Sequence, residues 1–141
     1  MFCSTTQEVR RLLGAISPRS PFGVRDYLAI ITLCHTGMRI GEANRLQVRY
    51  IAGEGRILDE IYLPSSITKT RRARTIPLNP IAQKALGKIL FFNQKRGFSV
   101  EPHAPVFPWK NHGFLPIRES ERVVQKLREK ASLSAKITPR A

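Results

Sequence analysis

The chain has 141 residues, of which 42% are hydrophobic, and this is enough for one domain with a buried core. Lys and Arg number 24 against 10 Asp and Glu, which gives a formal charge of +14. Nucleic acid is the partner that this charge favours, because cations that neutralise phosphates release counterions; an anionic membrane surface ranks second. No run of 18 apolar residues and no signal-peptide pattern is present, so we expect neither a membrane span nor secretion.

The cysteines and histidines do not have the spacing of a metal site. Cys34 lies in an apolar run, and we expect it to be a buried free thiol. Together with Cys3, it fits a reducing, cytoplasmic setting. The three histidines are expected to be loop or core residues: His35, His103 and His112.

The first third of the chain is helical in pattern. A capping-box pattern that begins at Thr5 predicts a helix over about residues 5–16, and two prolines break it within residues 17–21. Val24–His35 is apolar on most faces, which is typical of a central core helix. Gly37 follows as the expected C-terminal cap of that helix.

The middle third changes to short segments of alternating polarity. A short helix is expected over about residues 40–46, and strands over 48–51, 60–63 and 73–76, with a glycine-rich turn at 53–55. The economical arrangement of these strands is one three-stranded antiparallel sheet.

The last third returns to helices. Asn79 followed by proline predicts a helix that runs to about Gln94, and a proline-rich loop over 99–116 separates it from a last helix over 117–131. The Thr-Pro pair at 138–139 is typical of a further helix start. We therefore expect an α+β, mainly α, single domain over residues 1–141 that lacks its final helices.

Charge is distributed unevenly along the chain. No Asp or Glu occurs from Ile61 to Val100, which predicts a phosphate-facing surface centred on the hairpin that precedes residue 78. The basic residues of this stretch are Lys69, Arg71, Arg72, Arg74, Lys84, Lys88, Lys95 and Arg96.

Two motifs stand in register along the chain. Residues 36–43 read T-G-M-R-I-G-E-A, and residues 68–78 read T-K-T-R-R-A-R-T-I-P-L. In this order, between these helices, they resemble the catalytic domain of tyrosine recombinases, the phage integrase family. The resemblance extends from about Thr5 to Arg140. It implies a fold of helices around a small three-stranded sheet.

The resemblance also implies a chemistry. The family cuts DNA by attack of a tyrosine hydroxyl on a phosphodiester, without a metal or other cofactor. Arg39 matches the first of two phosphate-holding arginines, and a guanidinium fork suits the non-bridging oxygens. Glu42 would orient Arg39 or pair with it, and Lys69 matches the lysine that protonates the leaving 5′ oxygen.

Further basic residues are expected to touch DNA. Arg74 matches a recurring hairpin arginine, whose predicted partner is a backbone phosphate. The other predicted DNA contacts are Arg71, Arg72, Lys84 and Lys88. Arg140 falls at the first basic position of the family's second motif.

This sequence departs from the family's pattern at its C-terminal end. The second phosphate-holding arginine would fall at position 143, and Tyr27, Tyr50 and Tyr62 lie on a predicted core helix and strands rather than at the nucleophile's position. We therefore expect a DNA-binding protein of site-specific recombination or integration that does not cleave DNA alone. The alternative is a repurposed basic module that binds DNA or a partner without recombinase activity.

The expected partner is double-stranded DNA; RNA binding needs only the charge and ranks last. A core left uncovered by the missing helices would favour a homo-oligomer or a helix-donating partner. The expected location is the cytoplasm, at the nucleoid, in a prokaryote or a phage or mobile element.

Overall fold

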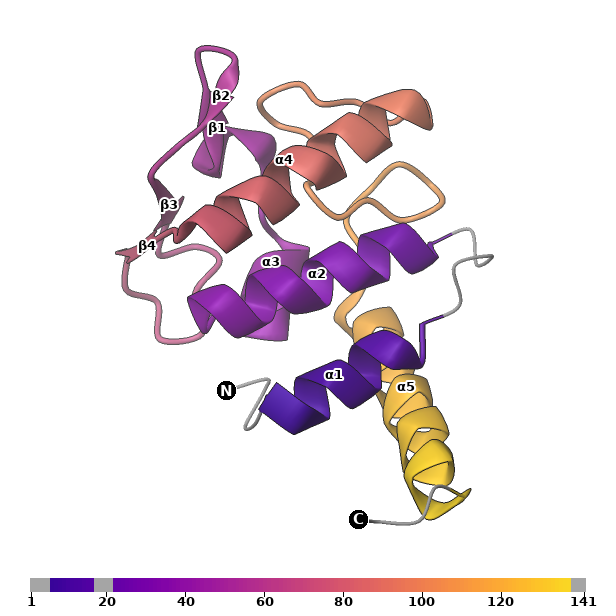
Figure 1. Ribbon diagram of the computed structural model, residues 1–141. Helices are drawn as coiled ribbons and strands as arrows, with labels where there is room; N and C mark the ends of the chain where they lie inside the picture. The colour runs from indigo at the N-terminus through magenta and orange to yellow at the C-terminus, as the bar shows by residue number, and fades with distance from the viewer. Residues whose placement is uncertain (1–5, 17–21, 138–141) are drawn as a thin grey trace.

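The computed structural model describes residues 6–16 and 22–137. Two helices that run in opposite directions form the centre of the protein (Figure 1). Helix α2 (Gly23–Thr36) packs most extensively against α4 (Pro80–Lys95) (Figure 1). Helix α4 starts at the predicted cap, where the Asn79 side chain accepts a hydrogen bond from the backbone N–H of Ala82 at 2.8 Å. Both helices therefore confirm the sequence prediction closely.

Helix α2 ends where the sequence predicts. Gly37 has φ of 72°, and its N–H donates to the carbonyl of Leu33 at 3.0 Å, the left-handed cap that favours glycine. The chain then passes Met38, which is completely buried, into the short helix α3 (Ile40–Asn44). This turn fixes where the first motif lies relative to the core.

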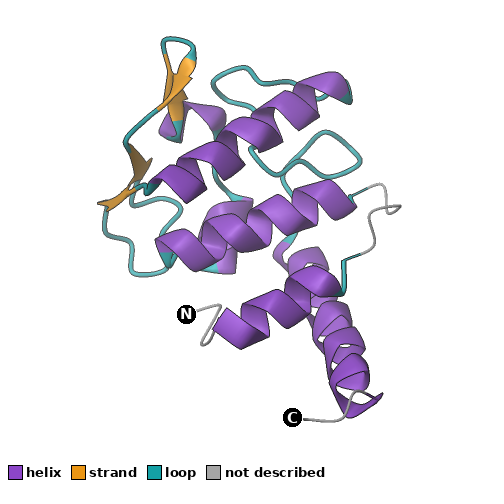
Figure 2. Ribbon diagram, in the orientation of Figure 1, coloured by secondary structure: helices purple, strands orange, loops and turns teal. Residues whose placement is uncertain are grey.

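The expected three-stranded sheet is wrong in its strand count. Strand β1 (Ala52–Gly53) pairs with β2 (Arg56–Ile57), and β3 (Glu60–Leu63) pairs separately with β4 (Arg74–Pro77), so the described residues form two antiparallel hairpins (Figure 2). Glu54 and Gly55, at the tip of the first hairpin, both have positive φ, as a tight two-residue turn requires.

The predicted strand over residues 48–51 is instead the 3₁₀ helix η1 (Val48–Tyr50). Val48, Tyr50 and Ile51 are all buried. An extended strand would place Tyr50 and Ile51 on opposite faces, whereas a 3₁₀ turn brings residues 48 and 51 to the same side. Burial of all three side chains thus favours the turn over the strand.

Helices α1 (Thr6–Gly14) and α5 (Ile117–Ile137) pack against each other on one side of the core, and α5 also contacts α3 (Figure 1). Helix α5 is longer than predicted. The capping residue Thr5, the proline break at 17–21 and the Thr-Pro pair at 138–139 lie outside the described residues.

The proline-rich segment before α5 is fastened to the core by backbone hydrogen bonds. Val106 donates its N–H to the carbonyl of Leu46 at 3.0 Å, and Asn93 donates its side-chain amide to the carbonyl of Val106 at 2.9 Å. Val106 and the following Phe107 are buried. The loop is therefore part of the core packing, as an anchored loop should be.

The structure also bears on the cysteines and on membrane spans. Cys34 is disulfide-bonded, so the expectation of a free thiol is wrong; the only other cysteine of the sequence, Cys3, lies outside the described residues. Within residues 6–16 and 22–137, no helix has the length and apolar character needed to cross a bilayer.

Candidate phosphate-binding site

A buried carboxylate joins the two sequence motifs. Glu42 Oε2 accepts a hydrogen bond from Arg74 Nη1 at 2.6 Å, and Glu42 Oε1 accepts one from Arg74 Nη2 at 2.8 Å. Glu42 is 1% exposed, and it lies on α3, while Arg74 opens β4. This two-pronged pair holds the start of α3 against the β3–β4 hairpin.

Glu42 also holds the backbone of the first motif. Its Oε1 accepts the backbone N–H of Arg39 at 3.0 Å, so one carboxylate receives three hydrogen bonds. Burial alone would raise the pKa of Glu42, but the hydrogen bonds from Arg74 and from the Arg39 backbone outweigh it, and the pKa is lowered from its ordinary 4.5. Glu42 is therefore a charged anchor at neutral pH.

The Arg39 side chain acts on Glu42 only through its charge, which helps to lower the pKa of that carboxyl. Arg39 precedes the first residue of α3 and is exposed. Its guanidinium makes no hydrogen bond or ion pair with any described residue. The expected pairing of Glu42 with Arg39 thus holds only for the backbone, and the ion pair that forms instead is Glu42–Arg74.

Lys69 lies on the loop between β3 and β4. The residues just before it are buried: Ile67 packs into the core, and the Thr68 hydroxyl donates to the carbonyl of Arg72 at 3.0 Å. Lys69 itself is exposed. The loop is thus attached to the core through the two residues before Lys69. The Lys69 side chain itself is accessible from solvent, as a ligand-binding lysine has to be.

The other predicted DNA contacts are also on the surface. Arg71 and Arg72 follow Lys69 on the same loop, and Arg71 has φ of 57°, which turns the backbone sharply there. Lys84 and Lys88 are exposed one turn apart on α4. The remaining site residue, Arg140, lies outside the described residues.

Arg74 has a structural role that the sequence did not predict. Both of its terminal nitrogens donate to Glu42, and its side chain is 36% exposed. A DNA phosphate would therefore have to approach a guanidinium whose two terminal groups are already engaged. Its phosphate contact stays a prediction, while its structural role is visible.

Sequence reasoning missed Arg25, a buried cation of α2. Its Nη2 donates to Asp26 Oδ1 at 2.8 Å, and its Nη1 donates to the carbonyl of Pro108 at 3.1 Å. The guanidinium also lies 4.2 Å from the ring centre of Phe22 and 5.8 Å from that of Trp109. The only signal in the sequence was an arginine inside an otherwise apolar helix.

The described residues offer little to other site chemistries. They contain no group of three or more His, Cys, Asp or Glu side chains that could hold a metal ion. Tyr50 is buried on η1, and Tyr27 and Tyr62 are partly exposed on α2 and β3. The exposed cations around the Glu42–Arg74 pair are therefore the candidate site.

A sequence model described as the phage integrase family matches residues 4–141. The chain belongs to the phage integrase family. This confirms the recognition made from the two motifs, and it relates the integrase-family chain to proteins that act on DNA in site-specific recombination.

Among solved structures, the fold resembles the crystal structure of XerA recombinase, with a TM-score of 0.67 and 21% sequence identity. The match covers 92% of this chain and 42% of that one, so this chain spans less than half the length of the protein it matches. The mainly helical fold with small antiparallel strand pairs is thereby confirmed. No curated protein matches the sequence.

Proposed function

We propose that this integrase-family chain binds double-stranded DNA as a protein of site-specific recombination or integration. Arg39 would hold a backbone phosphate, and Lys69 would lie at the bridging oxygen of the same phosphodiester. The observation that carries the proposal is the Glu42–Arg74 pair, because it joins the two motifs while Arg39 and Lys69 both stay exposed.

The chemistry of each residue supports its proposed role. The Arg39 guanidinium offers several N–H donors in a planar fork that suits two non-bridging oxygens. An ammonium such as that of Lys69 can donate a proton to an oxygen that leaves as an alkoxide. The surrounding cations, Arg71, Arg72, Lys84 and Lys88, would contribute sequence-independent phosphate contacts.

We propose further that the 141-residue chain binds DNA without cleaving it. Among its residues, the three tyrosines lie on α2, η1 and β3, and none stands at the family's nucleophile position. The second candidate function is a repurposed basic module that binds DNA or a protein partner. Its support is the number of large apolar side chains that are exposed, such as Ile81 at 54%.

The test is a titration of a fluorescent DNA duplex at several salt concentrations. Arg39→Ala and Lys69→Ala should each weaken binding, and each should lower the slope of log K against log salt by about 1. Lys126→Ala is the matched control, because it removes an exposed lysine of α5, a helix that carries neither motif. Equal losses in all three variants would contradict a specific site and leave only charge.

Cleavage is tested separately. The chain is incubated with nicked and intact duplexes and run on a denaturing gel, where a tyrosine–DNA adduct would migrate slowly. We expect no adduct. An adduct would show that one of the three tyrosines is a nucleophile, and tighter binding to structured RNA than to duplex DNA at equal salt would overturn the choice of ligand.

Two finer points stay proposals. Self-association, or binding of a partner helix, would cover exposed apolar side chains and is read out by sedimentation at several concentrations. A cytoplasmic location at the nucleoid follows from the proposed DNA binding and is read out by fluorescence microscopy of a tagged chain.

A further inference from the structure

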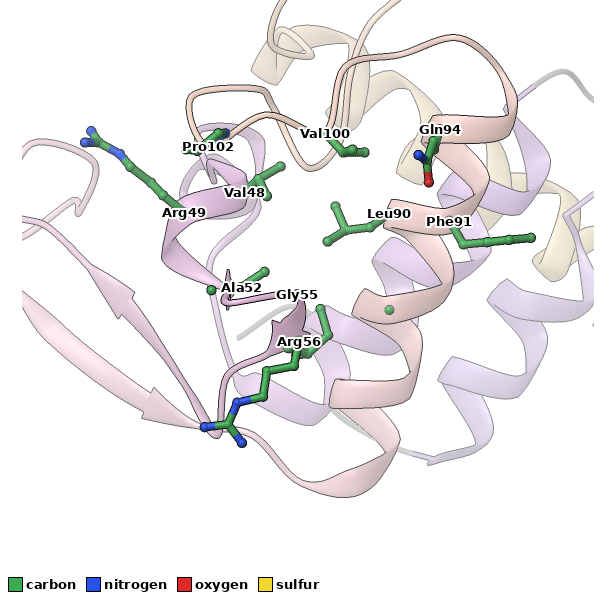
Figure 3. A pocket seen from close by; sticks show the side chains of 13 residues that line it. Val48, Arg49, Ala52, Gly55, Arg56, Leu90, Phe91, Gln94, Val100 and Pro102 are labelled. Atoms are coloured by element: carbon green, nitrogen blue, oxygen red, sulfur yellow. The ribbon is translucent and has the colours of Figure 1, made fainter.

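A groove lies between helix α4 and the β1–β2 hairpin, on the described surface outside the candidate phosphate-binding site. Its volume is about 580 Å³, within the range of roughly 300–1,000 Å³ that ligand sites occupy. Figure 3 shows Leu90, Val48 and Val100 directed toward the open space from three different elements. The groove is thus a concave apolar surface, and no described residue fills it.

The floor of the groove is made of small residues. Gly87 of α4 and Gly53 and Gly55 of the hairpin line it, together with Ala52. A Cβ added at Gly87 would meet its nearest heavy atom, Ile57 Cγ1, at 3.8 Å, an ordinary contact. Space rather than backbone geometry therefore distinguishes position 87, and an occupant can approach α4 closely there.

The rim of the groove is basic. Arg49 and Arg56 line it, and Figure 3 shows both guanidinium groups directed outward from the apolar walls. Arg49 is fixed by hydrogen bonds from its Nε to Gln47 and from its Nη2 to the Tyr50 hydroxyl. Two exposed acids, Glu54 and Glu101, neighbour lining residues in the sequence but do not line the groove themselves. An occupant therefore meets apolar walls first and arginines at the edge.

We propose that this groove binds an amphipathic helix with acidic flanks, contributed by a different protein. Apolar side chains of the helix would enter between Leu90 and Val100, and its carboxylates would pair with Arg49 and Arg56. An added strand fits less well, because β1 and β2 have two residues each and offer too short an edge for pairing.

Two other occupants fit the chemistry less well. A DNA backbone would bring charged phosphates against apolar walls, which costs desolvation. Helix α5 of a second copy carries six basic and three acidic residues, and like charges would meet at the arginine rim.

Phe91, which lines the groove and is 62% exposed, adds to the apolar surface available to an acidic helix.

The experiment measures fluorescence anisotropy of a labelled acidic peptide of about 16 residues, roughly four helical turns, with leucines on one face and glutamates on the other. One control peptide carries lysines in place of the glutamates, and another has the same composition in scrambled order. The protein is the whole chain. Gly87→Leu fills the floor, and Arg56→Glu reverses one rim charge.

Each variant has a matched control. Ile81→Ala changes an exposed apolar residue of the same helix outside the groove, and Arg45→Glu reverses an exposed charge that does not line it. Gly87→Ala serves if Gly87→Leu does not fold, because its methyl group meets only an ordinary contact. Circular dichroism of each variant establishes that it is folded.

We expect the acidic peptide alone to bind, and Gly87→Leu and Arg56→Glu each to weaken it by about tenfold or more, as when a central contact of an interface is lost. The control variants should bind as the unchanged chain does. Equal binding of the scrambled peptide, binding unaffected by Gly87→Leu, or no binding would overturn the proposal. So would a dimer that Gly87→Leu abolishes, because it would give the groove to a second copy.

Discussion

At the scale of single residues, Glu42 carries more of the site than its place in the sequence suggested. It is buried, it accepts three hydrogen bonds, and two of them come from a residue 32 positions away. A buried carboxylate is tolerated only when it is paired and hydrogen-bonded. Arg74 supplies that pairing, so the two residues act as one structural unit.

Removing the charge of this unit should destabilise the fold. Glu42→Gln leaves the Arg74 guanidinium without its anion, and we expect a loss of about 1.5–3 kcal/mol, the usual range for hydrogen bonds to charged groups. The measurement is urea unfolding. Glu119→Gln is the control: it removes a pair with Arg122 at 3.7 Å whose arginine is largely exposed, and its effect should be about 0–1 kcal/mol.

The lowered pKa of Glu42 predicts how stability changes in acid. A carboxylate whose pKa is lower in the folded state contributes fully above its ordinary pKa of 4.5 and loses that contribution as the pH falls through the folded pKa. The unfolding free energy of the unchanged chain should therefore fall more steeply than that of Glu42→Gln below about pH 4.5. Parallel curves for the two proteins would contradict this.

Asp26 acts in the opposite direction. Burial raises the pKa of Asp26 from its ordinary 3.8, against the pull of Arg25. A raised carboxylate pKa means that the folded state binds the proton more tightly than the unfolded state does. The contribution of Asp26 to the unfolding free energy is therefore largest at low pH and decreases as the pH rises through the folded pKa. Comparison with Glu42→Gln isolates Glu42, because Asp26 is present in both proteins.

At the scale of elements, loops are held by side chains that the sequence pattern did not single out. Arg25 joins α2 to the proline-rich segment through the Pro108 carbonyl and lies against Phe22 and Trp109, whose rings stack at 5.7 Å. The loop therefore depends on one buried cation as well as on its apolar anchors.

Substitution of this cation should loosen the segment. Arg25→Lys keeps the charge but loses the planar fork, so contacts to Asp26, Pro108 and the two rings cannot all be kept. We expect a loss of about 2 kcal/mol or more, within the range for a broken buried network. Unfolding is followed by the fluorescence of Trp109, the only tryptophan, whose emission should shift to the red in the folded variant. Arg122→Lys, on the surface of α5, should change neither the unfolding free energy nor the emission of Trp109.

The cap of α4 allows a test with two parts. Asn79→Ala removes the oxygen that accepts the Ala82 N–H and should cost about 1 kcal/mol. Asn79→Ser restores a capping oxygen but not the amide contact with His35 Nδ1, at 3.1 Å. Thermal unfolding should rank the unchanged chain and the serine variant above the alanine variant, and equal values for serine and alanine would mean that the cap contributes nothing.

Local signals predicted the helices well and the sheet poorly. Gly37 and Asn79 act through neighbouring residues, so their caps are readable from the sequence. Val48 and Ile51 were read as strand because apolar residues of short segments fit either period, and only packing against the core decides between them.

The candidate site shows the same difference between local signals, which the sequence reveals, and long-range contacts, which it does not. The motifs gave Arg39 and Lys69 together with a reason for each, but not the partner of Glu42. The choice between Arg39 and Arg74 depends on a contact across 32 residues, which no local pattern encodes. Arg25 was missed for the same reason, since its partner Pro108 is 83 residues away.

At the scale of the whole molecule, the described residues are not equally well packed. The core cluster runs through α2, α3, η1, the β3–β4 hairpin and α4. The described side chains of α5 include few that are buried, Ser120 and Ala131 among them. Helix α5 packs mainly against α1 and α3. Elements with few buried contacts open at lower free energy than the core.

Hydrogen exchange should reveal this difference. Amides of α1 and of the second half of α5 should exchange faster than those of α2 and α4, with the buried central turn of α4 as the internal reference. Mass spectrometry of peptic fragments gives the comparison directly. Uniform protection across all four helices would mean that the molecule opens only as a whole.

The shared carboxylate of Glu42 has a consequence for how such a sequence changes over generations. A substitution at position 42 leaves Arg74 facing a neutral or apolar cavity, and a substitution at 74 leaves a buried anion, so either step alone lowers fitness through stability. Lineages should therefore cross from this pair to another combination rarely, and in two closely spaced steps. The Arg39 guanidinium makes no hydrogen bond to Glu42, so a substitution at position 39 leaves the Glu42–Arg74 pair in place, and position 39 should vary more independently.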